Sequence, residues 1–82
     1  MSDAYVGEVR AMPYNFAPSG WALCQGQLIQ LSQNTALYSL IGNTYGGDGR
    51  SNFALPKLDP LPGKCGTLNY CIALQGIYPQ HG

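Results

Sequence analysis

Charged residues are scarce, at 10 % of the 82 residues against roughly 25 % in an ordinary soluble domain. Four acidic and four basic side chains cancel, so the net charge is zero at pH 7. No basic run is available to neutralise a phosphate backbone, so nucleic acid is not expected as a partner. Few charges also leave little repulsion between copies and little protection for exposed sheet edges. This composition favours self-association over a monomer whose Asn, Gln, Ser and Thr side chains solvate its surface.

Long apolar runs are missing as well. No stretch approaches the roughly 20 residues that a membrane-spanning helix needs, so membrane insertion is not expected. The first residues, Met1 to Val6, have neither the basic region nor the apolar core of a secretory signal. If the protein works outside a cell, we expect it to leave by lysis or by a route that the sequence does not show.

Groups for catalysis and metal binding are few. The single histidine, His81, lies one residue from the end of the chain, where we expect a solvated tail rather than a member of a hydrolase triad. Together with His81, the three cysteines would match the ligand number of a structural zinc site, but no closely spaced pair occurs among them. The sequence therefore predicts neither an enzyme nor a bound metal or other cofactor.

The cysteines, Cys24, Cys65 and Cys71, leave their pairing open. One disulfide with a free thiol, three reduced thiols, or a bridge to another subunit all fit an odd count. If residues 65–71 are extended, the Cα atoms of Cys65 and Cys71 lie roughly 20 Å apart, too far for a disulfide. Either one could then pair only with Cys24 or across an interface, unless Gly66 turns the chain. The alternative is buried, unpaired cysteine.

The residue pattern indicates an α+β fold with a small, mostly antiparallel sheet and one short helix. Residues 5–12 alternate as a strand. Residues 21–24 and 27–31 flank Gln25-Gly26, which is the spacing of a two-residue hairpin. Residues 67–75 alternate again and have one strongly apolar face, which predicts a C-terminal strand.

The one helix is expected over residues 33–41. Ser32 or Asn34 can cap its start, and Gly42 can end it. Three apolar side chains at helical spacing make a stripe that must lie on the sheet, namely Leu37, Leu40 and Ile41.

The glycine-rich segment Gly46-Gly47-Asp48-Gly49-Arg50 invites comparison with ligand-binding loops. It lacks the G-x-x-x-x-G-K-[ST] order of a phosphate-binding loop and the helix that should follow it. A calcium site would need several oxygen ligands at alternating positions, whereas only Asp48 is acidic here. We therefore expect a structural turn in which Asp48 accepts hydrogen bonds from nearby backbone amides and can pair with Arg50.

Several motifs together resemble the phage tail collar family. They are Gly7-Glu8-Val9-Arg10, the segment from Asn15 to Gln27 that contains Pro-Ser-Gly-Trp-Ala-Leu-Cys-Gln-Gly, the segment from Leu31 to Gly42, and Thr44-Tyr45-Gly46-Gly47-Asp48-Gly49-Arg50-Ser51-Asn52-Phe53-Ala54-Leu55-Pro56. The branch resembled most is often labelled microcystin-dependent protein. Members of that branch carry a long Gly/His-rich middle, which a short connector replaces here, and Lys57 stands where they have aspartate. The resemblance implies a single domain, 1–82, divided into the collar motif 6–56, the connector 57–66 and the C-terminal strand segment 67–78.

The resemblance also implies a structural, non-catalytic subunit of a virion tail or of an extracellular or cell-surface appendage. Its expected partner is itself, in a homo-oligomer or a filament joined by strand pairing and, where a thiol is available, by intersubunit disulfides. The residues expected to join copies are Leu68, Tyr70, Cys71, Ile72 and Leu74 of the terminal strand, with Tyr5 and Val9 of the first strand as the partner edge.

A tail-fibre tip that binds a glycan or receptor on a bacterial surface is the alternative function. It would need several aromatic side chains exposed together as a platform. The candidates are Tyr14, Phe16, Trp21, Tyr38, Tyr45, Phe53, Tyr70 and Tyr78. The missing middle segment weakens this alternative, because receptor contacts would be sought there.

Overall fold

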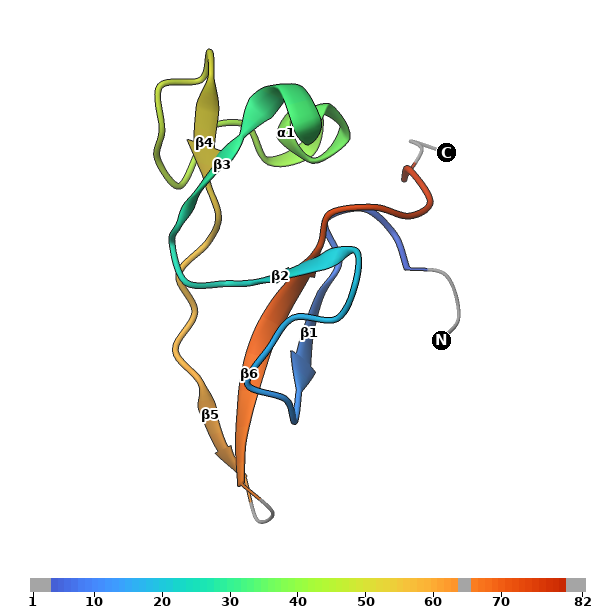
Figure 1. Cartoon of the computed structure of the whole chain (residues 1–82), viewed down its shortest axis with the longest axis vertical. Coiled ribbons are helices and arrows are strands. Elements are labelled where there is room, and N and C mark those ends of the chain that lie inside the picture. Colours follow the sequence, from blue (N-terminus) through green and yellow to red (C-terminus); the bar gives the residue numbers. More distant parts are fainter. Residues whose placement is uncertain (1–3, 64–65, 80–82) are drawn as a thin grey trace.

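The computed structural model describes residues 4–63 and 66–79 and has the predicted α+β fold (Figure 1). Its elements, in chain order, are β1 (Val9–Met12), β2 (Trp21–Leu23), β3 (Leu28–Gln30), the 3-10 helix η1 (Leu31–Gln33), α1 (Thr35–Ile41), β4 (Asn52–Ala54), β5 (Leu61–Gly63) and β6 (Gly66–Ala73). The molecule measures 40 × 28 × 22 Å, with β3, β4 and α1 at one end and the β5–β6 hairpin at the other. Within the described part of the chain, no helix is both long and apolar enough to cross a membrane.

The C-terminal strand β6 lies in the middle of the main sheet. β1 pairs with it on one side, from Val9 opposite Ile72 to Met12 opposite Asn69. β2 pairs with it on the other side along residues 71–73, and β5 pairs with its first residues. The sequence predicts this strand, but the prediction that it offers unpaired backbone groups to a second molecule is wrong. Residues 70–73 of β6 are already paired on both flanks within the chain, and residues 66–68 are paired with β5.

The hairpin predicted at Gln25-Gly26 does not form. β2 pairs with β6, whereas β3 pairs with β4 in a separate two-stranded sheet. The chain does turn here, because Gly26 has φ +78° and its backbone N donates to Pro56 O at 3.3 Å. The turn carries the chain from one sheet to the other instead of folding it back on itself (Figure 1).

The helix forms close to the predicted place, with η1 leading into α1. Asn34 occupies the N-cap position, but its side chain donates to Gln30 O instead of accepting from a helix amide. Gly42 ends α1, and its N–H donates to Tyr38 O at 2.7 Å. Of the predicted apolar stripe, Leu37 is fully buried whereas Leu40 is 37 % exposed.

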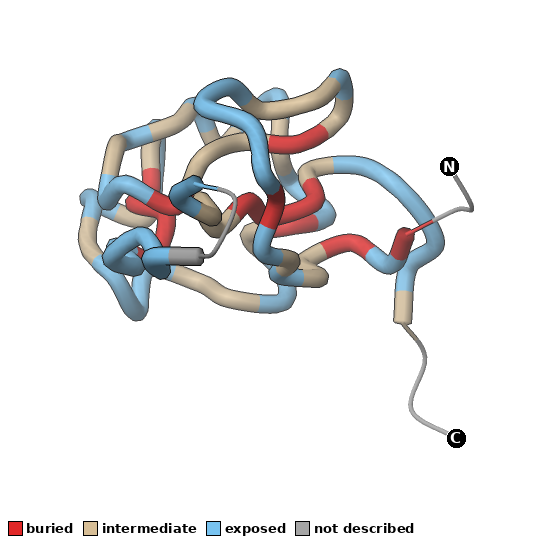
Figure 2. Tube along the Cα trace, turned by 90° about the horizontal axis from the view of Figure 1, so that it is seen from below, coloured by how far each residue is buried: buried red, intermediate tan, exposed pale blue. Residues whose placement is uncertain are grey.

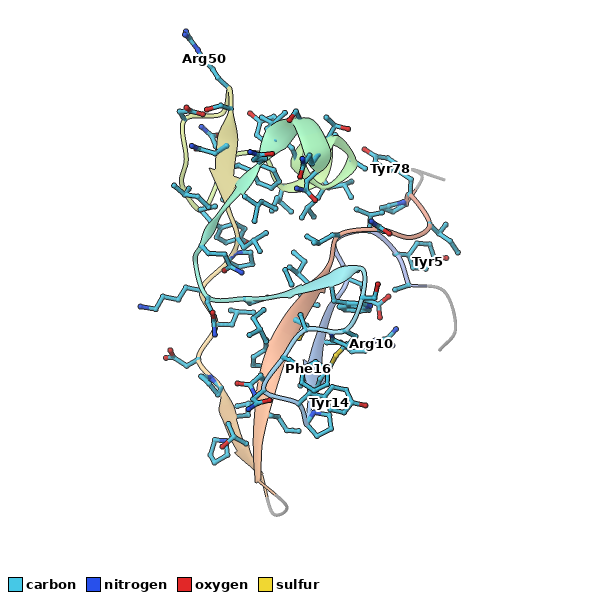
Figure 3. All side chains as sticks on the ribbon, viewed as in Figure 1. Tyr5, Arg10, Tyr14, Phe16, Arg50 and Tyr78 are labelled. Carbon is cyan, nitrogen blue, oxygen red and sulfur yellow. The ribbon has the colours of Figure 1, made fainter. Side chains whose placement is uncertain are left out.

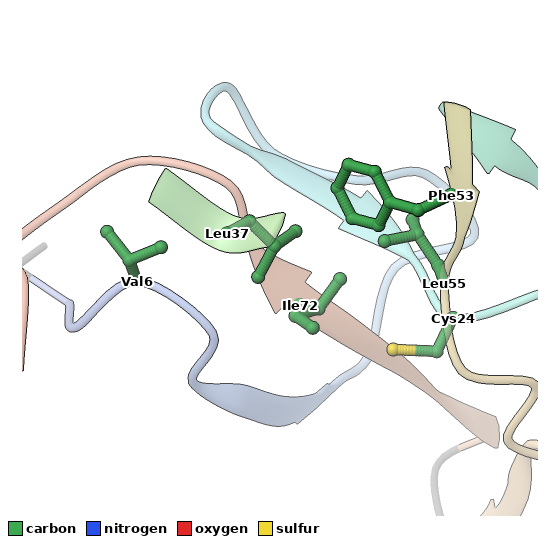
Figure 4. Packing of buried hydrophobic residues seen from close by; sticks show 6 residues of the cluster. All are labelled: Val6, Cys24, Leu37, Phe53, Leu55 and Ile72. Atoms are coloured by element: carbon green, nitrogen blue, oxygen red, sulfur yellow. The ribbon is translucent and has the colours of Figure 1, made fainter. Parts of the chain in front are cut away.

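Apolar side chains cover both faces of β6 near its C-terminal end. One core cluster consists of Val6, Cys24, Leu37, Phe53, Leu55 and Ile72 (Figure 4). The other consists of Ala4, Met12, Trp21, Cys71 and Ala73. Cys71 and Ile72 are consecutive, so they point to opposite faces of the sheet. The buried residues accordingly run through the middle of the molecule with exposed segments around them (Figure 2).

The described ends of the chain are paired side by side. Tyr5 and Ile77 form a parallel bridge, in which Val6 N donates to Ile77 O at 2.9 Å and Ile77 N donates to Ala4 O at 2.8 Å. Gly76 precedes this bridge with φ +144°, and a Cβ atom there would lie 2.1 Å from Ala4 O. Only glycine therefore permits the two segments to approach so closely.

Candidate functional site

The C-terminal segment predicted to join copies is buried at Cys71 and Ile72 and half-buried at its other predicted residues. None of its five predicted assembly residues is exposed, namely Leu68, Tyr70, Cys71, Ile72 and Leu74. Cys71 is 0 % exposed and Ile72 1 %. By contrast, the two residues predicted on the partner edge, Tyr5 and Val9, are both exposed. The candidate surface for assembly therefore lies along β1.

β1 is the outer strand on its side of the main sheet, and no second strand pairs with it among the described residues (Figure 1). One hydrogen bond shows which backbone groups near β1 are directed toward β6. Ala73 N donates to Glu8 O at 2.9 Å, so Glu8 directs its carbonyl group toward β6. Bonded and non-bonded pairs alternate along an antiparallel ladder, so Arg10 also directs its backbone groups toward β6. Val9 and Ala11 then direct their N–H and C=O groups outward. We call these two residues the open edge.

The strand is shorter than the predicted range 5–12 because the chain turns at Gly7. Glu8 N donates to Tyr5 O at 3.0 Å across this turn, and Gly7 has φ +86°. Gly7 N and Glu8 O both bond to Ala73, so two residues of the first segment face one residue of β6. Such a bulge bends a strand and ends regular pairing. The open edge therefore begins after Glu8.

Sequence and exposure limit the open edge at its other end. Val9 is 42 % exposed and Ala11 is also exposed. Pro13 occupies the next outward position by the same alternation, and proline has no N–H to donate. The open edge therefore lies within residues 9–11, with two outward-directed residues, and this short length restricts what can pair with it.

A Glu8–Arg10 ion pair flanks the open edge on the opposite face of β1. Arg10 (Figure 3) donates from Nε to Glu8 Oε2 at 2.8 Å, and its guanidinium lies 5.4 Å from the centre of the Trp21 ring. The hydrogen bond from Arg10, followed by one from Tyr5 N, lowers the pKa of Glu8 below its ordinary value. Glu8 is therefore ionised at neutral pH, and its negative charge balances the positive charge of Arg10.

The aromatic residues do not form one common platform. Tyr14 and Phe16 stack on each other with ring centres 5.3 Å apart and are both exposed (Figure 3). Asn69 Nδ2 holds their loop by donating to Tyr14 O at 2.7 Å. Trp21 and Phe53, by contrast, belong to the two core clusters. What the structure brings together is a pair of exposed rings rather than the wider set that the sequence suggested.

The glycine-rich loop is the structural turn that the sequence predicts. Asp48 Oδ1 accepts hydrogen bonds from the backbone N atoms of Arg50, Ser51 and Asn52 at 2.8–3.1 Å. These bonds hold the pKa of Asp48 well below its ordinary 3.8. The side chain of Arg50 points away from the loop (Figure 3), so its backbone rather than its guanidinium meets Asp48. The loop thus stabilises itself.

A family model described as Phage Tail Collar Domain matches residues 7–60, more than half of the chain. The chain belongs to the phage tail collar domain family. A search of curated proteins and one of solved structures found no significant match. The family match supports a structural role in a phage tail and agrees with the prediction of a non-enzymatic protein. It includes β1 and the whole open edge of this collar domain, and it ends before β5 and β6.

The described thiols of the collar domain are shielded. Cys24 and Cys71 are both buried and unpaired. Burial, followed by the charge of nearby Cys71, raises the pKa of Cys24 from 9.0 to about 11, and burial also raises the pKa of Cys71. An intersubunit disulfide through Cys71 is therefore incompatible with the folded strand β6, since the sulfur lies in the core. Cys65, the third cysteine whose pairing the sequence leaves open, lies outside the described residues.

Ligand-binding features are limited in the described part of this collar domain. No group of three or more His, Cys, Asp or Glu side chains lies close enough there to hold a metal ion. His81 and Cys65, which the zinc comparison needs, lie outside the described residues. A pocket of about 140 Å³ between the connector and β6 is lined in part by Lys57 and Asp59. This volume is well below the roughly 300 Å³ at which small-molecule sites begin. A larger and more open hollow of about 520 Å³ lies beside the paired chain ends and is lined by Tyr5, Ile77, Tyr78 and Pro79.

The sequence analysis named Val9 but missed Ala11 as the other residue of the open edge, and it also missed the flanking Glu8–Arg10 pair. The signal was available, because Pro13 closes a short segment of alternating residues directly after them. The sequence did not indicate that β6 would occupy one side of β1 and leave the other side open.

Proposed function

We propose that this collar domain is a non-catalytic subunit that associates with copies of itself in a phage tail or in an extracellular filament of phage-tail type. The open edge carries the proposal. Val9 and Ala11 present unpaired backbone donors and acceptors on a strand that has an exposed apolar side chain. Such an edge is a template for pairing with another chain unless charge or cover protects it. Here the neighbouring charges, Glu8 and Arg10, neutralise each other.

Composition adds a second line of support. With a net charge of zero, long-range repulsion does not hold copies apart. The route differs from the one that the sequence favoured, because residues 70–73 of β6 are paired on both flanks and Cys71 is buried. The proposed contact is therefore non-covalent and uses the N-terminal edge.

The test is Val9→Lys, which places a cation on the open edge at a site that is already exposed. We expect its self-association to be at least about tenfold weaker than that of the wild type, because a lysine on an exposed strand edge opposes pairing with a second strand. Sedimentation velocity over a concentration series, with negative-stain microscopy, measures the association. Leu28→Lys is the matched control, since Leu28 is 57 % exposed on β3, away from β1. A wild type that stays monomeric at high concentration contradicts the proposal.

A second candidate function is glycan binding by the stacked Tyr14–Phe16 pair. Phe16 is 59 % exposed, and its loop is held by Asn69, so an aromatic face is presented at little cost in side-chain ordering. Titration with bacterial surface glycans should then give binding that Phe16→Ala abolishes. Equal binding by the wild type and Phe16→Ala would eliminate this candidate.

A further inference from the structure

We infer that the open edge pairs with the open edge of a second copy, antiparallel and about a two-fold axis at Val9, so that Glu8 of each copy faces Arg10 of the other. This inference rests on the proposed self-association and specifies its geometry. It makes the main sheet continuous across the two copies, with β1 beside β1 at the junction.

The open edge is complementary to itself. It has two outward N–H groups and two outward C=O groups, on Val9 and Ala11. Antiparallel pairing of identical strands about a two-fold axis lets each copy donate and accept at the same position. The edge is also short, because the bulge at Gly7 and the missing N–H of Pro13 close its two ends. A long peptide strand from another protein would find no regular ladder to extend.

In three antiparallel two-fold registers, outward-directed backbone N–H and C=O groups of one copy lie opposite those of the other copy. In the first, Val9 faces Ala11 of the partner copy, which brings Arg10 directly opposite Arg10, and like charges opposite each other destabilise a strand pair. In the second, Ala11 faces Ala11, which sets Val9 opposite Pro13, where no donor exists, and sets Arg10 opposite the uncharged Met12. In the third, Val9 faces Val9 and Glu8 faces Arg10 in both directions, while Ala11 faces Gly7, whose N–H is already bonded to Ala73 O.

Charge complementarity selects the third register. Within one copy, Glu8 and Arg10 already bind each other on one face of β1, and Arg10 lies over Trp21. In the third register the Glu8–Arg10 pair of the second copy lies beside that of the first. Each carboxylate then has a guanidinium of its own copy and one of the other copy as neighbours, so the four side chains form one ionic cluster. Opposite charges in directly facing positions stabilise a strand pair. Meanwhile the two exposed Val9 side chains meet on the other face.

Disulfide trapping tests the register. In the Val9-centred pair the two Val9 Cα atoms lie about 5.5 Å apart, within disulfide reach. The two Ala11 residues are then displaced by four strand positions, roughly 13 Å, and are out of reach. Val9→Cys and Ala11→Cys are made in a Cys65→Ser background and oxidised with copper–phenanthroline in air. Non-reducing gels then read the fraction of covalent dimer for each variant and for their mixture.

We expect most of the Val9→Cys protein to cross-link and the Ala11→Cys protein to stay uncross-linked. If Ala11→Cys cross-links and Val9→Cys does not, the second register is correct and the inference is overturned. If covalent dimer forms mainly in the mixture of the two variants, the first register is correct and the inference is again overturned. If sedimentation shows assemblies but no variant cross-links, the proposed self-association stands and this geometry is wrong. If the protein does not associate at all, both are wrong.

Hydrogen exchange on the unmodified protein provides a measurement that needs no variant. In the Val9-centred pair the amide of Val9 is bonded across the junction, so its exchange should slow at least about tenfold between dilute and assembled protein. The amide of Leu28, on β3, is the internal control and should not change between the two samples. Unchanged exchange at Val9 in assembled protein overturns the inference.

Discussion

Replacing Leu37 by alanine tests whether α1 is held to the sheet by one buried side chain. Leu37 is 0 % exposed and packs in the cluster that contains Phe53, Leu55 and Ile72. A buried Leu→Ala change costs about 2–5 kcal/mol, whereas a domain of this length has only about 4–12 kcal/mol in total. Even at 2 kcal/mol the midpoint of thermal unfolding should fall by about 8–16 °C.

Leu40→Ala is the matched control for that experiment. Both leucines lie on α1, so the change in helix propensity is the same, but Leu40 is 37 % exposed. We expect Leu40→Ala to lower the free energy of unfolding by less than about 1 kcal/mol, within the range of surface substitutions near a core. Urea unfolding followed by circular dichroism compares the two variants. Equal losses for Leu37→Ala and Leu40→Ala would refute the packing described for α1.

The loop and the thiols give two further predictions. Because the pKa of Asp48 is lower in the folded chain than its ordinary 3.8, the carboxylate stabilises the fold above about pH 4, and this contribution is lost as the pH falls through the folded-state pKa. Thermal unfolding should thus show the wild type more stable than Asp48→Asn at pH 7, with the difference shrinking below about pH 4; a difference independent of pH would count against the loop geometry. A rise of the Cys24 pKa from 9.0 to about 11 leaves about a hundredfold less thiolate at pH 8 than an ordinary thiol has. In a Cys65→Ser background, a thiol reagent should therefore label Cys24 and Cys71 only after denaturation, and fast labelling in native buffer would mean that β6 is not buried.

Local elements could be predicted from the sequence because their signals are local. The alternation of residues 67–75 identified β6, and the glycine and aspartate spacing identified the Asp48 turn. The helix was also found, because Leu37 and Ile41 recur at helical spacing before Gly42.

Strand partners could not be predicted in the same way. A period of two shows that a strand has two different faces, but it does not show which strands flank it. Thus β6 was expected at an edge and lies in the centre, and β2 was expected to pair with β3 but pairs with β6, which lies more than 40 residues later. The consequence for the site was direct: the hydrogen-bonding capacity assigned to Tyr70 and Ile72 is spent within the chain, and Val9 is left as the predicted residue with a free edge.

The side-by-side ends bear on how the domain would respond to tension. The segments around Tyr5 and Ile77 run parallel, so the chain leaves from opposite ends of the shared ladder. A pull on both ends would shear the two hydrogen bonds at Ile77 simultaneously instead of opening them one after the other. Under this shear loading the paired segments at Tyr5 and Ile77 form the first mechanical barrier, and the main sheet is shielded from the force until their hydrogen bonds break.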